Sequence, residues 1–291
     1  MSEIDIAFDR DVLRRVCTMR EREFGAAYDL TVTKINQPAP ENYYFYRDHG
    51  SNVLAVAHLD TVGAADERDC HFVDTEAGPV VYSRALDDRL GAYIILELLP
   101  ALGIQHDILL TVGEESGNST AAGFAPPDGK RYDWIIEFDR GGTDVVMYQY
   151  DDAQTRDAVR RSGARVGDGI FSDICYLEHL GVKGFNWGVG YQDYHGPRAH
   201  AYLDDTFSMV EHYLDFFADN DGVSMPHESA EDDFWVGGSW GGKAIDFDPD
   251  YADYDGRSAG SDFLDPDWIE YPTSEQMREF EAREERWLSE H

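Results

Sequence analysis

VLAVAHLDT, residues 53–61, sets a pattern that recurs along this chain, a short apolar run followed by ionisable residues. Residues 108–115, ILLTVGEE, end such a run with two glutamates, and residues 134–139, WIIEFD, end one with an aspartate. Short continuous apolar runs are typical of strands buried on both faces of a parallel or mixed sheet. Because ligands bind at the carboxyl ends of the strands in an open α/β sheet, we expect these polar ends to meet at one edge.

Helical patterns alternate with the apolar runs over residues 1–222. The expected strands cover residues 43–46, 53–57, 108–112, 134–138 and 184–189. The expected helices cover residues 8–23, 90–99, 153–161, 174–180 and 205–217. Strands that alternate with helices predict an α/β domain with three αβα layers and a mixed, mostly parallel central sheet.

The composition changes over residues 223–291, where acidic clusters and glycine become frequent. This segment also contains four of the six tryptophans, which is poor composition for permanent disorder. Thr273 and Gln276 have the spacing of a capping box, and apolar residues follow near one helical face. We therefore expect a separate C-terminal extension that docks on another surface and ends in an amphipathic helix.

The formal net charge is −34, from 58 acidic and 24 basic residues. Electrostatic repulsion argues against nucleic acid or an anionic membrane as a partner. No apolar run approaches the roughly 20 residues of a membrane span, and the N-terminus has no signal-peptide pattern. The three cysteines are far apart and odd in number, which gives no disulfide framework. We expect a soluble, cytoplasmic protein.

Two further stretches of the sequence add side chains that can bind metal ions to the expected sheet edge. Asp87 and Asp88 lie where a loop enters a helix, and His195 follows the expected strand 184–189. So many carboxylates at one edge would be costly unless cations neutralise them. Each motif alone has a common structural explanation, but together they predict a metal cluster. Carboxylate and imidazole ligands suit zinc, with manganese or cobalt as alternatives.

The order of these motifs resembles the superfamily of dinuclear zinc aminopeptidases, carboxypeptidases and deacylases over residues 52–203. The matching stretches are HLDTV at 58–62, ALDDRLG at 85–91, TVGEESG at 111–117 and YHGP at 194–197. The resemblance implies two metal ions held by His58, Asp87, Glu115, Asp139 and His195. It implies that Asp87 bridges the two ions, that Glu114 is the general base, and that Asp60 orients the His58 imidazole.

The chain departs from the family pattern after the last expected ligand. The family often has a glutamate there, whereas this chain has Pro197, Arg198, Ala199 and His200, so His200 competes with His195 for the ligand role. The gaps of 87 − 58 = 29 and 195 − 139 = 56 positions are too short for an inserted lid domain. The chain is therefore closest to compact aminopeptidases, with the Asp-Asp-Arg signature of the glutamyl aminopeptidase branch.

The resemblance implies a metal-dependent hydrolase that cleaves a peptide bond, and it favours an aminopeptidase. In such a centre two ions about 3.5–4 Å apart share a water, and Glu114 would take its proton and pass it to the leaving amine. An N-acyl amino-acid deacylase or a carboxypeptidase is the alternative, with Arg140 or Arg198 binding the substrate carboxylate. An inactive binding homologue and a homo-oligomeric state also stay open.

The large negative net charge predicts that the stability and activity of the protein depend on salt concentration. Only four lysines occur, and the acidic residues favour Asp, a composition that suggests a halophilic protein. Activity and the unfolding temperature should both rise from low to molar salt, because salt screens the repulsion between carboxylates. Thermal unfolding and turnover across a salt series test this. A protein that is equally stable and active at low salt is an ordinary acidic protein.

Overall fold

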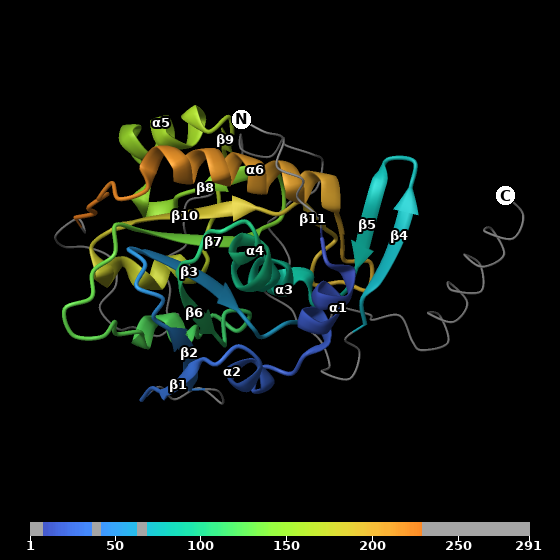
Figure 1. The fold of residues 1–291 in the computed structure, drawn as a ribbon, viewed down its shortest axis with the longest axis horizontal. Coiled ribbons are helices and arrows are strands. Elements are labelled where there is room, and N and C mark those ends of the chain that lie inside the picture. Colours follow the sequence, from blue (N-terminus) through green and yellow to red (C-terminus); the bar gives the residue numbers. More distant parts are fainter. Residues whose placement is uncertain (1–7, 37–41, 63–68, 229–291) are drawn as a thin grey trace, which may run out of the picture. The chain divides into compact units, whose positions relative to one another are not determined.

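The computed structural model describes residues 8–36, 42–62 and 69–228. The expected terminal helix, the capping box at Thr273 and the docking of the C-terminal extension lie outside these residues. The described part of the chain contains a large central sheet, a small second sheet, and helices that pack on both faces of the central sheet (Figure 1).

The central sheet has eight strands. In spatial order they are β1 (Thr31–Lys34), β2 (Tyr43–Arg47), β6 (Asp107–Thr111), β3 (Val53–His58), β7 (Trp134–Arg140), β10 (Lys183–Gly188), β8 (Asp144–Val146) and β9 (Arg165–Val166). The four central strands, β6, β3, β7 and β10, are parallel, and β2 and β8 flank them in antiparallel orientation. The predicted α/β class with a mixed, mostly parallel sheet is confirmed.

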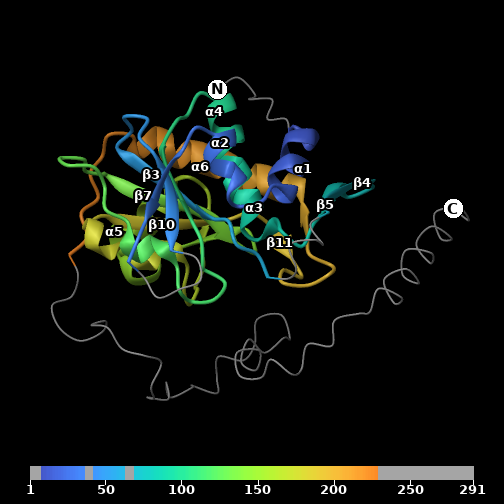
Figure 2. The same cartoon turned by 90° about the horizontal axis from the view of Figure 1, so that it is seen from below.

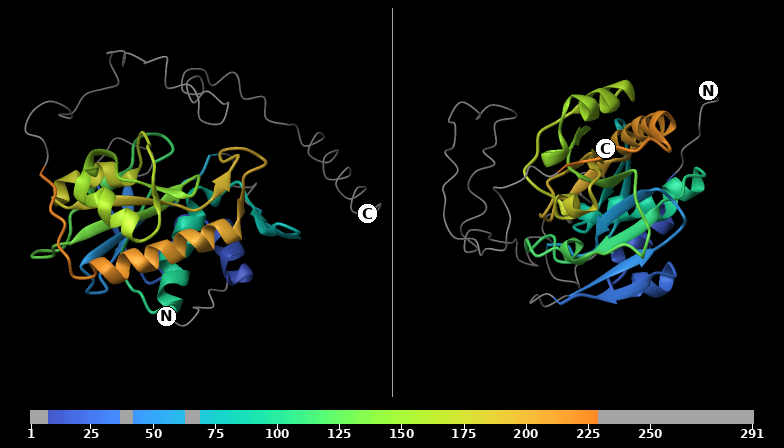
Figure 3. Two further views of the ribbon diagram at one scale, coloured as in Figure 1. Left: turned by 90° about the horizontal axis from the view of Figure 1, so that it is seen from above. Right: turned by 90° about the vertical axis from the view of Figure 1, so that its left-hand side faces the viewer.

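Helices form the outer layers. They are α1 (Arg10–Thr18), α2 (Glu23–Ala27), α3 (Leu86–Tyr93), α4 (Leu99–Ala101), α5 (Ala153–Arg161) and α6 (Leu203–Asn220), with a π-helical turn η2 (Ile94–Leu98) and the 3₁₀ helices η3 (Thr120–Gly123), η4 (Tyr148–Tyr150) and η5 (Asp173–Leu180). Helix α3 packs on β3 and β7 beside α1 (Figure 2). Helix η5 packs on β3, β7 and β10 from the opposite face, so the sheet is covered on both sides (Figure 3).

A second, four-stranded antiparallel sheet has the order β11 (Tyr191–Gln192), β12 (His200–Tyr202), β5 (Gly78–Tyr82) and β4 (His71–Thr75). Strands β4 and β5 form a hairpin that projects away from the central sheet (Figure 1). The described chain between β3 and α3 therefore contains a hairpin and no folded lid domain. The sequence patterns did not predict this sheet, because its strands have only two to five residues and little alternation.

The expected strands correspond to β2, β3, β6, β7 and β10, and the helix expected at 153–161 is α5. Two helix predictions need correction. The single helix expected over 8–23 is two helices, because Met19 adopts an extended conformation that ends α1. The helix expected over 174–180 is the 3₁₀ helix η5. In the described chain, no helix is both long and apolar enough to span a bilayer.

The chain beyond α6 first runs along the start of β10. Met225 is buried, its carbonyl accepts from Lys183 N at 2.8 Å, and His227 N donates to Gly181 O at 2.9 Å. These bonds attach residues 225–227 to the sheet. The division of the chain into residues 1–222 and 223–291 stays a prediction.

Asp107 organises the edge of the central sheet where β6 begins. It is fully buried, and Oδ1 accepts from the amides of His49 and Ser51 at 2.9 and 3.0 Å. Its Oδ2 accepts from two tyrosine hydroxyls and lies 2.6 Å from Lys130 Nζ. One carboxylate thus accepts from five donors at this edge, although Lys130 also pairs with Asp48 and the two tyrosine hydroxyls also contact each other.

We expect Asp107→Asn to lower the free energy of unfolding by about 1–3 kcal/mol, because the two backbone amides and two buried hydroxyls that donate to the carboxylate would face an amide with a single acceptor oxygen. Urea denaturation of the full chain measures this. The matched control is Asp74→Asn, which disrupts an exposed pair with Arg10 and should leave the unfolding midpoint unchanged. Equal midpoints for the two variants would contradict the role given to Asp107.

Candidate metal centre

The candidate site lies at the carboxyl edge of the central parallel strands. His58 is the last residue of β3, Glu114 and Glu115 follow β6, and Asp139 lies near the end of β7. Parallel pairing of β3 with β6 and of β3 with β7 brings these strand ends together. Asp87 enters from the start of α3, which packs against β3 and β7.

His58 is completely buried, and hydrogen bonding fixes its ring orientation. Its Nδ1 lies 2.9 Å from the carbonyl oxygen of Asp60. Because a carbonyl only accepts, Nδ1 carries the proton and donates it. Nε2 therefore faces the carboxylates, 3.1 Å from Asp87 Oδ1 and 3.6 Å from Asp139 Oδ1.

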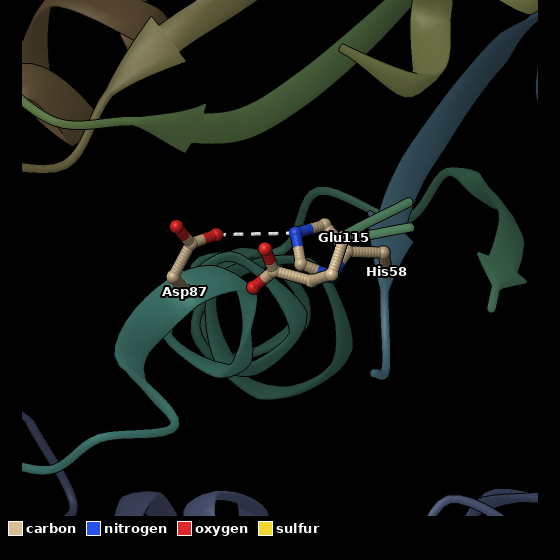
Figure 4. A group of neighbouring side chains, drawn as sticks. All are labelled: His58, Asp87 and Glu115. Carbon is tan, nitrogen blue, oxygen red and sulfur yellow. Dashed lines mark hydrogen bonds and ion pairs between the residues drawn. The ribbon is translucent and has the colours of Figure 1, made fainter. Parts of the chain in front are cut away.

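Asp87 spans two histidines. Its Oδ1 lies 3.1 Å from His58 Nε2, and its Oδ2 lies 2.9 Å from His195 Nε2. Figure 4 shows the first of these contacts, with Glu115 beside it. One ligand atom from each of His58, Asp87 and Glu115 lies within 4.8 Å of the other two. A carboxylate with one oxygen toward each imidazole is the arrangement that a bridging ligand requires.

Glu115 and His195 form the other side of the site. Glu115 Oε2 lies 3.1 Å from His195 Nε2. The His195 side chain is 43% exposed, whereas that of His58 is 0% exposed, so the two sides differ in access to water. His195 has a φ of +61°, a left-handed conformation that is uncommon for residues with a Cβ.

Asp139 is held from two directions. Its backbone amide donates to Asn186 Oδ1 at 3.0 Å, and its Oδ1 accepts from the Tyr191 hydroxyl at 2.7 Å. The sequence motifs indicate neither partner. Both bonds join parts of the chain that are about fifty positions apart, and no local pattern predicts such contacts.

Asp60 supports the glutamate pair. Its carboxylate accepts from the amide of Glu115 at 3.1 Å and from that of Glu114 at 3.4 Å. The backbone carbonyl of Asp60 accepts from His58 Nδ1, whereas Asp60 Oδ1 is 3.7 Å from Nδ1, and the orienting role of Asp60 stays a prediction. Glu114 Oε2 lies 4.0 Å from His58 Nε2, and burial beside other carboxylates raises its pKa to about 9.

The electrostatics of the site show a deficit of positive charge. Burial, together with Asp87, raises the pKa of Asp139 to about 7. Burial opposes protonation of His195, yet Asp87 and Glu115 raise its pKa to about 10. Among the described residues, the ion pairs of Asp87 and Glu115 are with histidine alone.

One buried carboxylate oxygen tests whether these residues suit a metal ion. Glu115 Oε1 is buried and has no hydrogen-bond partner in the described chain. An unpartnered carboxylate oxygen beside imidazole nitrogens is a donor set suited to divalent ions. The residues present therefore fit a metal centre.

His200, the competing histidine, lies apart from these carboxylates. Its Nδ1 is 2.9 Å from the Arg198 carbonyl, and its ring stacks on Tyr82 with centroids 5.4 Å apart. Arg198 Nε lies 3.8 Å from Asp193, and Arg140 donates to Asp144 at 2.5 and 3.2 Å. Both candidate carboxylate-binding arginines thus have acidic neighbours.

Three further buried carboxylates lie near the site, and the sequence motifs assign no role to them. Asp88 follows Asp87 across a cis peptide bond, and Glu137 and Asp173 are also completely buried. Burial raises the pKa of Asp88 and of Glu137 well above the usual range, and that of Asp173 to about 6. The position of Glu137 within an apolar run was the available signal, since its neighbours predict a buried strand.

Sequence comparisons with protein-family models and with curated proteins find no match. Solved structures do match. A tripeptidase from Staphylococcus aureus subsp. aureus Mu50 has a TM-score of 0.50 and 12% sequence identity, covering 71% of this chain and 96% of that chain. Aminopeptidase PepT from Bacillus cereus has a TM-score of 0.48 and 11% identity, covering 71% and 91%. The chain shares its fold with the tripeptidase.

Proposed function

We propose that the protein is a metal-dependent hydrolase that cleaves peptide bonds as an aminopeptidase. The observation that carries the proposal is the position of Asp87 between His58 and His195. His58 and Asp139 would hold one divalent ion, Glu115 and His195 would hold the second, and Asp87 would bridge them. Zinc suits these ligands, with manganese and cobalt as alternatives.

The other residues of the site would have separate roles in catalysis. Bound divalent ions would act as Lewis acids on the scissile carbonyl and make water acidic enough to attack at neutral pH. Glu114, 4.0 Å from His58 Nε2, would accept the proton of the attacking water and deliver it to the leaving amine. Asp60 would hold the Glu114 and Glu115 backbone in place through their amides.

The charges around the site favour a free substrate amine over a substrate carboxylate. A carboxypeptidase or deacylase needs a guanidinium that can bind the carboxylate of its substrate. Arg140 already binds Asp144 through two nitrogens, and Arg198 lies near Asp193. These observations support an aminopeptidase over the two alternatives.

Metal analysis followed by a substrate panel tests the function. The purified full chain should hold roughly two equivalents of divalent ion, lose activity to a chelator and regain it with zinc. It should cleave aminoacyl-arylamides but not their N-acetyl forms, which lack the charged amine. Cleavage of N-acyl amino acids alone would instead identify a deacylase. Bound metal without turnover of either panel would support an inactive binding homologue.

Substitution of the proposed base separates binding from catalysis. Glu114→Gln should retain the bound metal, because this residue is outside the proposed ligand set, while turnover falls about 10²–10⁴-fold or more. Metal content and kcat are measured on the same preparation. Glu76→Gln, at an exposed position of the β4–β5 hairpin, is the matched control and should change neither. Full activity in Glu114→Gln would remove Glu114 from the mechanism.

A further inference from the structure

Tyr191 connects the segment that carries His195 to the opposite side of the candidate site. Its side chain is 3% exposed, and its hydroxyl donates to Asp139 Oδ1 at 2.7 Å. Tyr191 begins β11, four positions before His195, whereas Asp139 belongs to β7. One hydrogen bond therefore joins a proposed ligand of the His58 ion to the segment that supplies a proposed ligand of the other ion.

The segment around His195 needs such an anchor. Asp193 and His195 both have positive φ values, +49° and +61°, which residues with a Cβ adopt only when the surroundings hold them there. Backbone bonds fix its first residues, since Val189 N donates to Arg140 O at 2.8 Å and Gly190 N donates to Gly142 O at 3.0 Å. The Tyr191 side chain adds a fixed point closer to His195.

Tyr191 also packs against Gly141, the residue that follows β7. A Cβ added to Gly141 would lie 3.4 Å from two carbons of the ring and 3.1 Å from the Tyr191 carbonyl oxygen. The ring of Tyr194 lies 5.7 Å from that of Tyr191 and 4.8 Å from that of His195, centroid to centroid. A continuous series of contacts thus runs from Asp139 through Tyr191 and Tyr194 to His195.

We propose that Tyr191 is a positioning residue that fixes Asp139 and His195 relative to each other, so that the two metal sites form as one unit. The inference rests on the proposed function, because it takes these two residues as ligands. A hydroxyl that donates to one ligand carboxylate orients it, and groups behind ligands commonly contribute 10–100-fold to metal affinity. Here the same hydroxyl would act on both sites.

Tyr191→Phe removes the hydroxyl and keeps the ring. We expect the zinc affinity of both sites in the metal-free full chain to fall about 10–100-fold, measured by competition with a chelating dye. Tyr213→Phe is the matched control. It removes another buried hydroxyl contact, 2.5 Å to His106 Nε2, and should leave zinc affinity unchanged. Thermal unfolding of both metal-free variants checks that they are folded.

A second background tests whether Tyr191 acts through Asp139. In Asp139→Ala, the remaining site of Asp87, Glu115 and His195 should bind zinc equally well with Tyr191 or with Phe at position 191, because the anchor is already lost. Unchanged affinity in Tyr191→Phe alone, an equal loss in Tyr213→Phe, or a further loss in the Asp139→Ala background would each overturn the inference. Wild-type protein that binds zinc but hydrolyses nothing would refute the proposed function and leave this inference standing.

Discussion

Negative charge held away from water is the constraint on which the rest of the structure depends. Parallel strands deliver His58, Glu114, Glu115 and Asp139 to one edge, and α3 adds Asp87 to the same place. Burial raises the pKa of the neighbouring Asp88 and Glu137 well above the usual range, which reflects the cost of further negative charge at this place. Because like charges in a low dielectric repel strongly, the contacts of the remaining carboxylates with the imidazoles of His58 and His195 matter most for this site.

The elements that follow from hydrophobic pattern were predictable. Strands β3, β6 and β7 are continuous apolar runs, so both their positions and the edge where their polar ends meet could be inferred from the sequence. The small sheet could not be predicted, because strands as short as β11 and β12 carry too few residues for a pattern and form only through pairing with neighbouring strands. The helix expected over 8–23 was wrong for a local reason, the extended backbone at Met19, which periodicity does not detect.

The site was predictable as a set of residues but not as a set of contacts. His195 and His200 both follow β10, and their sequence contexts did not decide between them. The structure places His195 against Asp87 and Glu115, while His200 stacks on Tyr82. The bond from Tyr191 to Asp139 joins residues 191 − 139 = 52 positions apart, and no pattern in the sequence around them indicates it.

The second sheet aligns two chain segments that lead to the candidate site. Tyr82 pairs with His200 across β5 and β12. Tyr82 precedes Asp87 by 87 − 82 = 5 positions, and His200 follows His195 by 200 − 195 = 5 positions. The pairing therefore fixes the register between the strand that precedes Asp87 and the strand that follows His195, because slipping β12 by one residue would move its residues by about 3.4 Å along the strand and reverse the faces of their side chains. The backbone of β12 thus constrains where the chain that carries His195 joins the small sheet.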